Sequence, residues 1–155
     1  MSPRADVSMT PSEVSAFLAE PRTAVLSTLS RDGSPHAAGM WFVAYQREIR
    51  MWTYAKSQKA VNLRRDPRCA FLVEYGKGYS DLRGVLVKGS LTLVEDLEEI
   101  VTIGKELYER YTLPATGVAA EQGPIAEIER QARKRVGLVL PLRRVASWDH
   151  SKLGR

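Results

Sequence analysis

The sequence contains one cysteine and two histidines, and this scarcity removes several kinds of site. Cys69 has no partner for an intrachain disulfide, and because it lies in the apolar run CAFLV we expect a small buried hydrophobe. His36 and His150 are far apart in the chain, so nothing predicts a zinc site, and we expect no bound metal. Neither G-x-S-x-G nor a Walker A loop occurs, so neither motif supports a hydrolase or a nucleoside triphosphatase.

Long apolar runs are also absent. No run approaches the roughly 18 residues of a membrane span, and the first nine residues, MSPRADVSM, lack the apolar centre of a secretory signal. We therefore expect a cytoplasmic protein without a membrane partner. The 155 residues are 44% hydrophobic and 26% charged, as in a soluble globular domain. A net charge of +5 favours an anionic partner but does not choose between nucleic acid, a phosphorylated cofactor and an acidic ligand.

Turn residues and apolar patterning predict one domain over residues 10–150, with a flexible tail over residues 1–9 and a second tail over residues 151–155. Six β-like runs follow one another: TAVLSTL, SPHAAGMWFVAY, EIRMWTY, RCAFLVEY, LRGVLVKGSLTLVE and VGLVLPLRRVASWD. Asp32-Gly33 predicts a hairpin between the first two runs, and Pro141 predicts a break in the last. Because the connections are short and the helices few, we predict a mainly β, six-stranded barrel with peripheral helices.

Four segments have helical character. TPSEVSAFLAE starts with a capping box formed by Thr10 and Glu13, and DLEEIVTIGKELYERY is an amphipathic helix capped by Asp96. A short helix is expected from Gln58 to Arg65, where Asp66-Pro67 stops it. PIAEIERQARKR, residues 124–135, has the mixed charges of an ordinary exposed helix, and the preceding LPATGVAAEQG resembles a loop.

The stretch YAKSQKAVNLRRDPR, residues 54–68, holds five cationic side chains and one acid. Ser57 can cap the helix that starts at Gln58, so the unpaired N–H groups of the first turn lie beside Lys59. A phosphate group fits this point, and Asn62, one turn later, offers a further donor. The opposite end of the helix carries cations that suit a helix C-terminus: Arg64, Arg65 and Arg68.

Two other interpretations explain the same charges. A solvated basic helix needs no ligand, and a nucleic-acid site would use the basic helix together with aromatic residues of the preceding strands. These aromatics are Trp41, Phe42, Tyr45, Trp52 and Tyr54, and packing alone also explains them. We expect no nucleic-acid partner, because acids interrupt the cations elsewhere and no nucleic-acid motif occurs. An aromatic surface beside a phosphate pocket instead suits a cofactor with a ring and a phosphate.

The order VLSTLSRDGSPHAAGMWFVAY, EIRMWTYAKSQKAVNLRRDPRCAFLVE and YSDLRGVLVKGSLTLVED resembles a known superfamily. It is similar to the flavin and deazaflavin oxidoreductases of the pyridoxamine 5′-phosphate oxidase-like, FMN-binding split-barrel superfamily, and within it to the actinobacterial branch that uses coenzyme F-420. The resemblance extends over about residues 14–96 and to the closing run VGLVLPLRRVASWD. It implies a split β-barrel and a homodimer with cofactor sites at the subunit interface.

The resemblance also implies which residues hold the cofactor. The ring would lie against two neighbouring strands, the phosphate against the start of the basic helix, and one contact would come from another part of the barrel. This set is Ala37, Ala38, Gly39, Met40, Trp41, Phe42, Trp52, Thr53, Ser57, Gln58, Lys59, Asn62 and Arg83. Gln58 stands where the FMN oxidases often have Arg, so a doubly cationic phosphate clamp is missing there. Gly84 stands where the vitamin B6 oxidase has a side chain that reaches the flavin.

Together these expectations predict that the protein is a redox enzyme. We expect reduced coenzyme F-420 to transfer hydride to an unsaturated or conjugated small-molecule substrate. An FMN-dependent oxidoreductase with the same site and a cofactor carrier without turnover are the alternatives. No residue is marked as catalytic, and the candidates for the proton donor are water, Tyr79 and His36.

Overall fold

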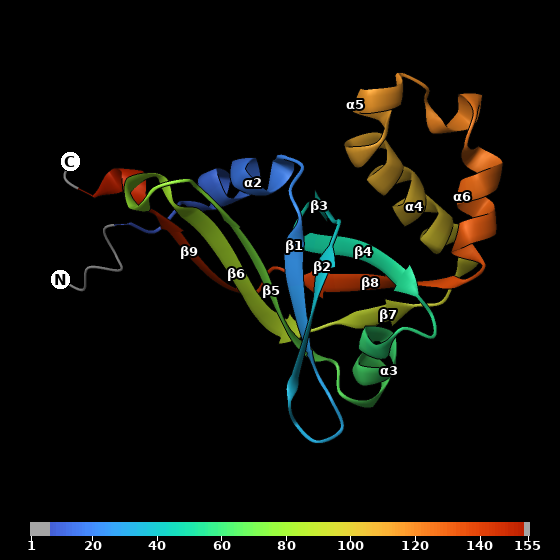
Figure 1. Ribbon diagram of the computed structural model, residues 1–155, viewed down its shortest axis with the longest axis horizontal. Coiled ribbons are helices and arrows are strands. Elements are labelled where there is room, and N and C mark those ends of the chain that lie inside the picture. Colours follow the sequence, from blue (N-terminus) through green and yellow to red (C-terminus); the bar gives the residue numbers. More distant parts are fainter. Residues whose placement is uncertain (1–6, 154–155) are drawn as a thin grey trace.

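The computed structural model describes residues 7–153, which form two antiparallel sheets with helices beside them (Figure 1). The larger sheet has the order β2-β1-β5-β6-β9, with β1 (Ala24–Leu29), β2 (Pro35–Met40), β5 (Arg68–Tyr75), β6 (Arg83–Ser90) and β9 (Arg144–Asp149). The smaller has the order β3-β4-β8-β7, with β3 (Val43–Tyr45), β4 (Glu48–Tyr54), β7 (Thr92–Val94) and β8 (Arg135–Pro141). The two sheets do not close on each other, so the expected mainly β split barrel is confirmed.

All six expected runs form strands. Each of three runs forms two strands, one in the larger sheet and one in the smaller. The chain leaves the five-stranded sheet at Trp41-Phe42 and again at Leu91, and it returns to that sheet at Leu142-Arg143. The six runs therefore give nine strands among the residues that the structure describes. Periodicity did not reveal the first two breaks, because the corner residues Phe42 and Leu91 are apolar and buried, as core-facing strand residues are.

The core lies between the two sheets. Leu26, Phe71 and Val85 reach it from the larger sheet, and Ile49 and Leu138 reach it from the smaller. At its centre the rings of Phe42 and Phe71 meet edge to face, with their centroids 5.0 Å apart. Burial also raises the pKa of the half-buried Cys69 thiol to about 11, which fits the expected role of a small hydrophobe.

The helices begin where the sequence predicts. In α2 (Pro11–Ala19) both hydrogen bonds of the expected capping box form, and α3 (Gln58–Arg65) and α4 (Leu97–Tyr111) have caps at Ser57 and Asp96. The expected loop after α4 contains α5 (Leu113–Thr116) and the 3-10 helix η2 (Ala120–Gln122). The next helix, α6 (Ile125–Ala132), ends before the predicted Arg135, which instead starts β8. Across residues 7–153 we find no helix with the length and apolar character that a bilayer crossing requires.

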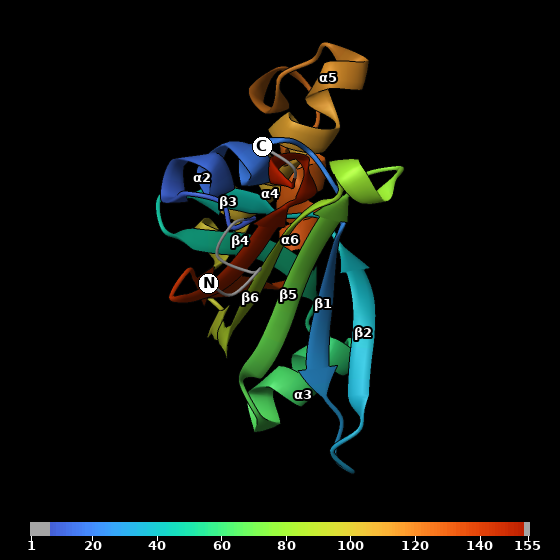
Figure 2. The ribbon, with the colours of Figure 1, turned by 90° about the vertical axis from the view of Figure 1, so that its left-hand side faces the viewer.

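The helices α4, α5 and α6 gather at one end of the molecule, where α4 packs on β4 and β8 (Figure 1). Figure 2 shows β5, β1 and β2 side by side, with α3 close to their lower ends. The 3-10 helix η1 (Tyr79–Asp81) lies in the expected loop between β5 and β6. The helical insertion therefore covers the smaller sheet, while α3 packs near the end of β1.

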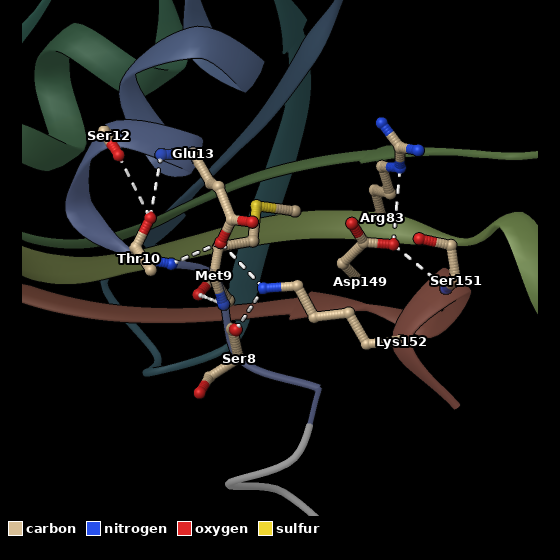
Figure 3. Close-up of polar contacts among 10 residues, drawn as sticks. Ser8, Met9, Thr10, Ser12, Glu13, Arg83, Asp149, Ser151 and Lys152 are labelled. Carbon is tan, nitrogen blue, oxygen red and sulfur yellow. Dashed lines mark hydrogen bonds and ion pairs between the residues drawn. The ribbon is translucent and has the colours of Figure 1, made fainter. Parts of the chain in front are cut away.

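Parts of both expected tails contact the domain. Residues 1–6 lie outside the described residues, but the Val7 carbonyl oxygen accepts from the Asp149 N–H of β9 at 2.7 Å, and the Met9 N–H donates to the Ser147 hydroxyl of β9 at 3.0 Å. At the other end, η3 (His150–Lys152) places the Lys152 ammonium 2.7 Å from the Glu13 carboxylate (Figure 3). Val7 and Met9 thus contact β9, and Lys152 contacts α2.

Replacing Phe42 by alanine tests its position in the core. We expect Phe42→Ala to lower the free energy of unfolding by about 3–5 kcal/mol, because the change removes a fully buried ring and leaves a cavity. Urea unfolding measures this value. The exposed Val61 provides a control, and Val61→Ala should change the free energy by no more than about 0.5 kcal/mol. A stable Phe42→Ala protein that binds cofactor poorly would contradict the core assignment.

Candidate functional site

A pocket of about 650 Å³ opens between β2, β4 and the helices α4 and α6. Several expected cofactor residues line it: Gly39, Met40, Trp41, Trp52, Thr53 and Lys59. The pocket also has a helical wall, which includes Gly104, Tyr108 and Gln131. The structure therefore brings the aromatic strands and the start of the basic helix to one cavity, as the sequence predicted, and adds a wall that the sequence did not predict.

Other expected ring contacts lie outside this cavity. Ala37 and Ala38 are further along β2 and do not line the pocket. Phe42 is fully buried between the sheets, and its backbone N–H donates to the Tyr111 hydroxyl at 3.2 Å. Its side chain therefore serves the core, because the corner between β2 and β3 turns it inward.

The aromatic surface of the pocket is held by the surrounding chain. Trp41 is 53% exposed and stacks on Tyr111, with centroids 4.7 Å apart and planes 3° apart. The Tyr111 hydroxyl also lies 2.7 Å from the Arg22 carbonyl oxygen, which it can donate to. Trp52 lies against Gly104, where an added Cβ would be 2.5 Å from the indole. Both indoles are thus positioned by contacts from α4.

The start of α3 forms the cationic end of the pocket. The Ser57 hydroxyl accepts a hydrogen bond from the Ala60 N–H at 3.3 Å, which confirms the predicted cap. Lys59 lines the pocket, and its ammonium group forms no hydrogen bond or ion pair with any residue from 7 to 153. Burial lowers the pKa of Lys59, and the positive charge of Arg135 lowers it further. The ammonium group is therefore an unpaired cation beside an aromatic surface.

Gln58 and Asn62 hold α3 in place. Asn62 is fully buried, donates to the Thr28 hydroxyl at 3.1 Å and accepts from the Gln58 amide at 2.8 Å. Burial puts the Asn62 amide out of reach of a ligand in the pocket, which corrects the expectation of a phosphate donor. The hydrogen bond to Thr28 explains the polar residue here, since it fixes α3 to β1.

Three arginines follow Asn62 at or just after the C-terminus of α3. Arg64 donates to the Ala55 carbonyl oxygen at 2.6 Å, and Arg65 donates to the Leu29 carbonyl oxygen. Arg68 lies 2.7 Å from the Asp66 carboxylate, and this contact lowers the pKa of Asp66 to about 2. Each guanidinium therefore has a partner within the chain.

Arg83 lies at the far end of the larger sheet from the pocket lining. Its guanidinium is 3.4 Å from Asp149 (Figure 3), and within one chain it does not line the cavity. The neighbouring Gly84 lies under the Trp148 indole, whose N–H donates to Glu74 at 3.1 Å. A side chain at position 84 would collide with this indole, which is the structural reason for glycine there.

Arg135 is a pocket residue that the sequence placed elsewhere. It lies opposite Tyr54 in the β4–β8 pair, and its guanidinium is 4.2 Å from the Tyr54 ring centroid and 4.5 Å from that of Trp52. Arg135 therefore brings a second cation to the pocket beside Lys59, although Gln58 is uncharged and the doubly cationic clamp is missing there. Charge patterning could not find it, because the basic run 133–135 reads equally well as a helix end.

Gly104 is the feature of the sequence from which the helical wall could have been predicted. A glycine inside a helix costs about 1 kcal/mol relative to alanine, so its presence within α4 indicates a close neighbour. That neighbour is Trp52, with Ile128 of α6 also in contact range.

Within the described part of the chain, no three His, Cys, Asp or Glu side chains are grouped as metal ligands would be.

Comparison with known proteins places this geometry in a family. Residues 10–149 match the family described as pyridoxamine 5′-phosphate oxidase. The chain belongs to this family. Among solved structures, a conserved hypothetical protein from Mycobacterium tuberculosis is 42% identical, over 100% of this chain and 94% of that chain, with a TM-score of 0.89. No curated protein matches the chain.

Two more distant members of this fold have named roles. A structure named F-420 reductase is 24% identical over 84% of this chain and 93% of its own, with a TM-score of 0.64. The heme storage protein HutZ from Vibrio cholerae is 18% identical over 87% of this chain and 92% of its own, with a TM-score of 0.65. At these identities the likeness shows the fold alone, so the role has to be argued from the pocket.

Replacing Gly104 by alanine tests the contact with Trp52. Helix propensity alone would stabilise α4 by about 1 kcal/mol, but the new methyl group would displace the indole. We expect Gly104→Ala to lower the free energy of unfolding and to shift tryptophan fluorescence. Thr102→Ala, at an exposed position of the same helix, is the control and should shift neither. A stability gain for Gly104→Ala would show that the indole is not held.

Proposed function

We propose that the protein is an oxidoreductase that uses reduced coenzyme F-420 to transfer hydride to an unsaturated or conjugated small molecule. The observation that carries this proposal is the pocket in which Trp41 and Trp52 lie beside the unpaired Lys59. A planar ring can lie along the indoles while its phosphate reaches Lys59 and the first-turn N–H groups of α3. Family membership and the fold shared with an F-420 reductase support a cofactor of the flavin type.

The cofactor, when bound, would supply the hydride. The chain positions the reactants and limits access of water, and α4 and α6 form the wall that does this opposite the strands. Neither expected proton donor lines the pocket: Tyr79 is 72% exposed and faces His150, and His36 lies at the far end of β2. The Tyr108 hydroxyl, which is closer, donates to the Val118 carbonyl oxygen at 2.8 Å. In this proposal, water therefore delivers the proton.

We also propose a homodimer formed through the outer face of the five-stranded sheet. The strand register places Gly39, Val25, Leu72, Leu86 and Ala146 in one row across this sheet. None of these five is fully buried, and Val25 is 40% exposed. An apolar row across a broad sheet is suited to an identical partner, because a twofold axis pairs it with itself. The resemblance to interfacial cofactor sites favours the same arrangement.

Cofactor binding and turnover test the proposed activity. We expect coenzyme F-420 to bind with a measurable fluorescence change and its reduced form to be oxidised by an added enal or quinone. Lys59→Ala should weaken binding by about tenfold or more, because a hydrogen bond to a charged group contributes about 1.5–3 kcal/mol. The neighbouring exposed Lys56 does not line the pocket, so Lys56→Ala is the matched control and should bind as wild type.

The same titration separates the other candidate functions. Micromolar FMN binding without deazaflavin binding would replace the proposed cofactor with FMN. Tight binding of either cofactor with no oxidation of its reduced form by enals, quinones or tetrapyrroles would indicate a carrier. Equal affinity of Lys59→Ala and wild type would place the phosphate elsewhere.

A charge introduced into the apolar row tests the dimer. We expect Leu72→Lys to elute as a monomer of 17.3 kDa in size-exclusion chromatography with light scattering, because the change would bury one unpaired charge from each subunit in the interface. Wild type should show twice this mass. Val61→Lys, on the exposed side of α3, is the control and should remain dimeric. A monomeric wild-type protein would overturn this arrangement.

A further inference from the structure

We propose that Arg135 is a second phosphate-binding residue of the pocket and acts together with Lys59. The ligand class is a phosphate ester attached to a planar ring, a chemistry that FMN and coenzyme F-420 share. The identity of the ring depends on the proposed function above. The anion site does not, because it follows from the charges and contacts of the pocket itself.

Both cations of the pocket lack an acceptor. Neither Arg135 nor Lys59 has a side-chain hydrogen bond or an ion pair with a residue between 7 and 153, and the Arg135 Nε is buried without a partner. The one acid in the pocket lining, Glu127, is directed to Arg130, with 2.6 Å between the charged atoms. The pocket therefore carries two positive charges that no residue in the described range 7–153 neutralises.

An anion would relieve the electrostatic cost of this arrangement. Burial lowers the pKa of both Lys59 and Arg135, and the two positive charges repel each other. The partly buried Arg50, by contrast, lies between Glu48 and Glu106, at 2.8 and 2.9 Å. A bound phosphate would provide the corresponding negative charge for Lys59 and Arg135.

The guanidinium is held in place before any ligand arrives. The rings of Tyr54 and Trp52 lie against it, and Tyr54 is its neighbour across the β4–β8 pair. The pairing continues past the strand ends, since the Ala55 N–H donates to the Lys134 carbonyl oxygen at 2.9 Å. The Ser57 N–H then donates to the Tyr54 carbonyl oxygen at 3.0 Å. Backbone bonds thus connect Arg135 to the start of the helix that carries Lys59.

The chemistry of the two side chains favours phosphate over a simple carboxylate. A guanidinium presents a planar pair of N–H donors that matches two oxygens of one phosphate. An ammonium is a compact charge that can approach an oxygen of the same group. Because each unesterified phosphate oxygen can accept more than one hydrogen bond, a phosphate monoester or diester can engage both cations in the pocket that Trp41 and Trp52 also line.

Ring ligands with and without phosphate provide the test. Dissociation constants are measured by fluorescence for FMN against riboflavin, and for coenzyme F-420 against its phosphate-free deazaflavin. We expect Arg135→Gln to weaken the phosphorylated member of the binding pair by about tenfold and to leave the phosphate-free member unchanged. Arg135→Lys keeps the charge and should recover part of the loss. The control is Arg133→Gln, an exposed position outside the pocket lining that should bind as wild type.

A second measurement uses the protein without any ring ligand. Inorganic pyrophosphate should raise the melting temperature of wild type and of Arg133→Gln, but not that of Arg135→Gln. If pyrophosphate behaves in this way while neither FMN nor coenzyme F-420 binds wild type, the proposed function fails and the anion site stands. The inference is overturned if Arg135→Gln binds every ligand as wild type does. It is also overturned if riboflavin and FMN lose affinity equally, since Arg135 would then only support the rings of Trp52 and Tyr54.

Discussion

The hydrogen-bonded pair of β4 and β8 is the interaction on which the rest of the site depends. Its register runs from Glu48 opposite Pro141 to Tyr54 opposite Arg135. Strand alternation turns Ile49 and Met51 of β4 into the interior, while Trp52 and Tyr54 face the pocket, which the buried Thr53 also lines. The same pair sets where α3 begins, because β4 ends one short turn before the Ser57 cap. A slip of one residue would exchange core and pocket residues along the whole strand.

The helical insertion converts this strand surface into a cavity. Arg50 of β4 lies 2.9 Å from Glu106 of α4, and Tyr111 of the same helix stacks on Trp41. Gly104 lets α4 approach the Trp52 indole closely, so the helical wall lies directly against this indole. The cations and indoles therefore come from β4, β8, α3 and the corner after β2, and α4 positions the two indoles.

The shared fold does not choose between redox chemistry and storage, since similar structures include an F-420 reductase and a heme storage protein. The charges of the pocket are more informative. Unpaired Lys59 and Arg135 point to an anionic ligand, and the indoles beside them point to a flat ring. A cofactor with both an anionic group and a flat ring would contact the cations and the indoles together, whereas a bare anion or an apolar ring would contact only one of the two.

Local sequence determined the features whose partners lie within a few residues. The capping box at Thr10, the cap at Ser57 and the bounds of α3 follow from side-chain to backbone bonds across one helical turn. The strands also follow from their patterning, and the resemblance in sequence identified the superfamily and six of the residues that line the pocket. Only the tertiary structure decided that Phe42 and Asn62 are buried, that Arg135 joins Lys59 and that Gly104 supports Trp52. These pairings join residues from separate elements, and they depend on strand register and helix packing, which local patterns do not encode.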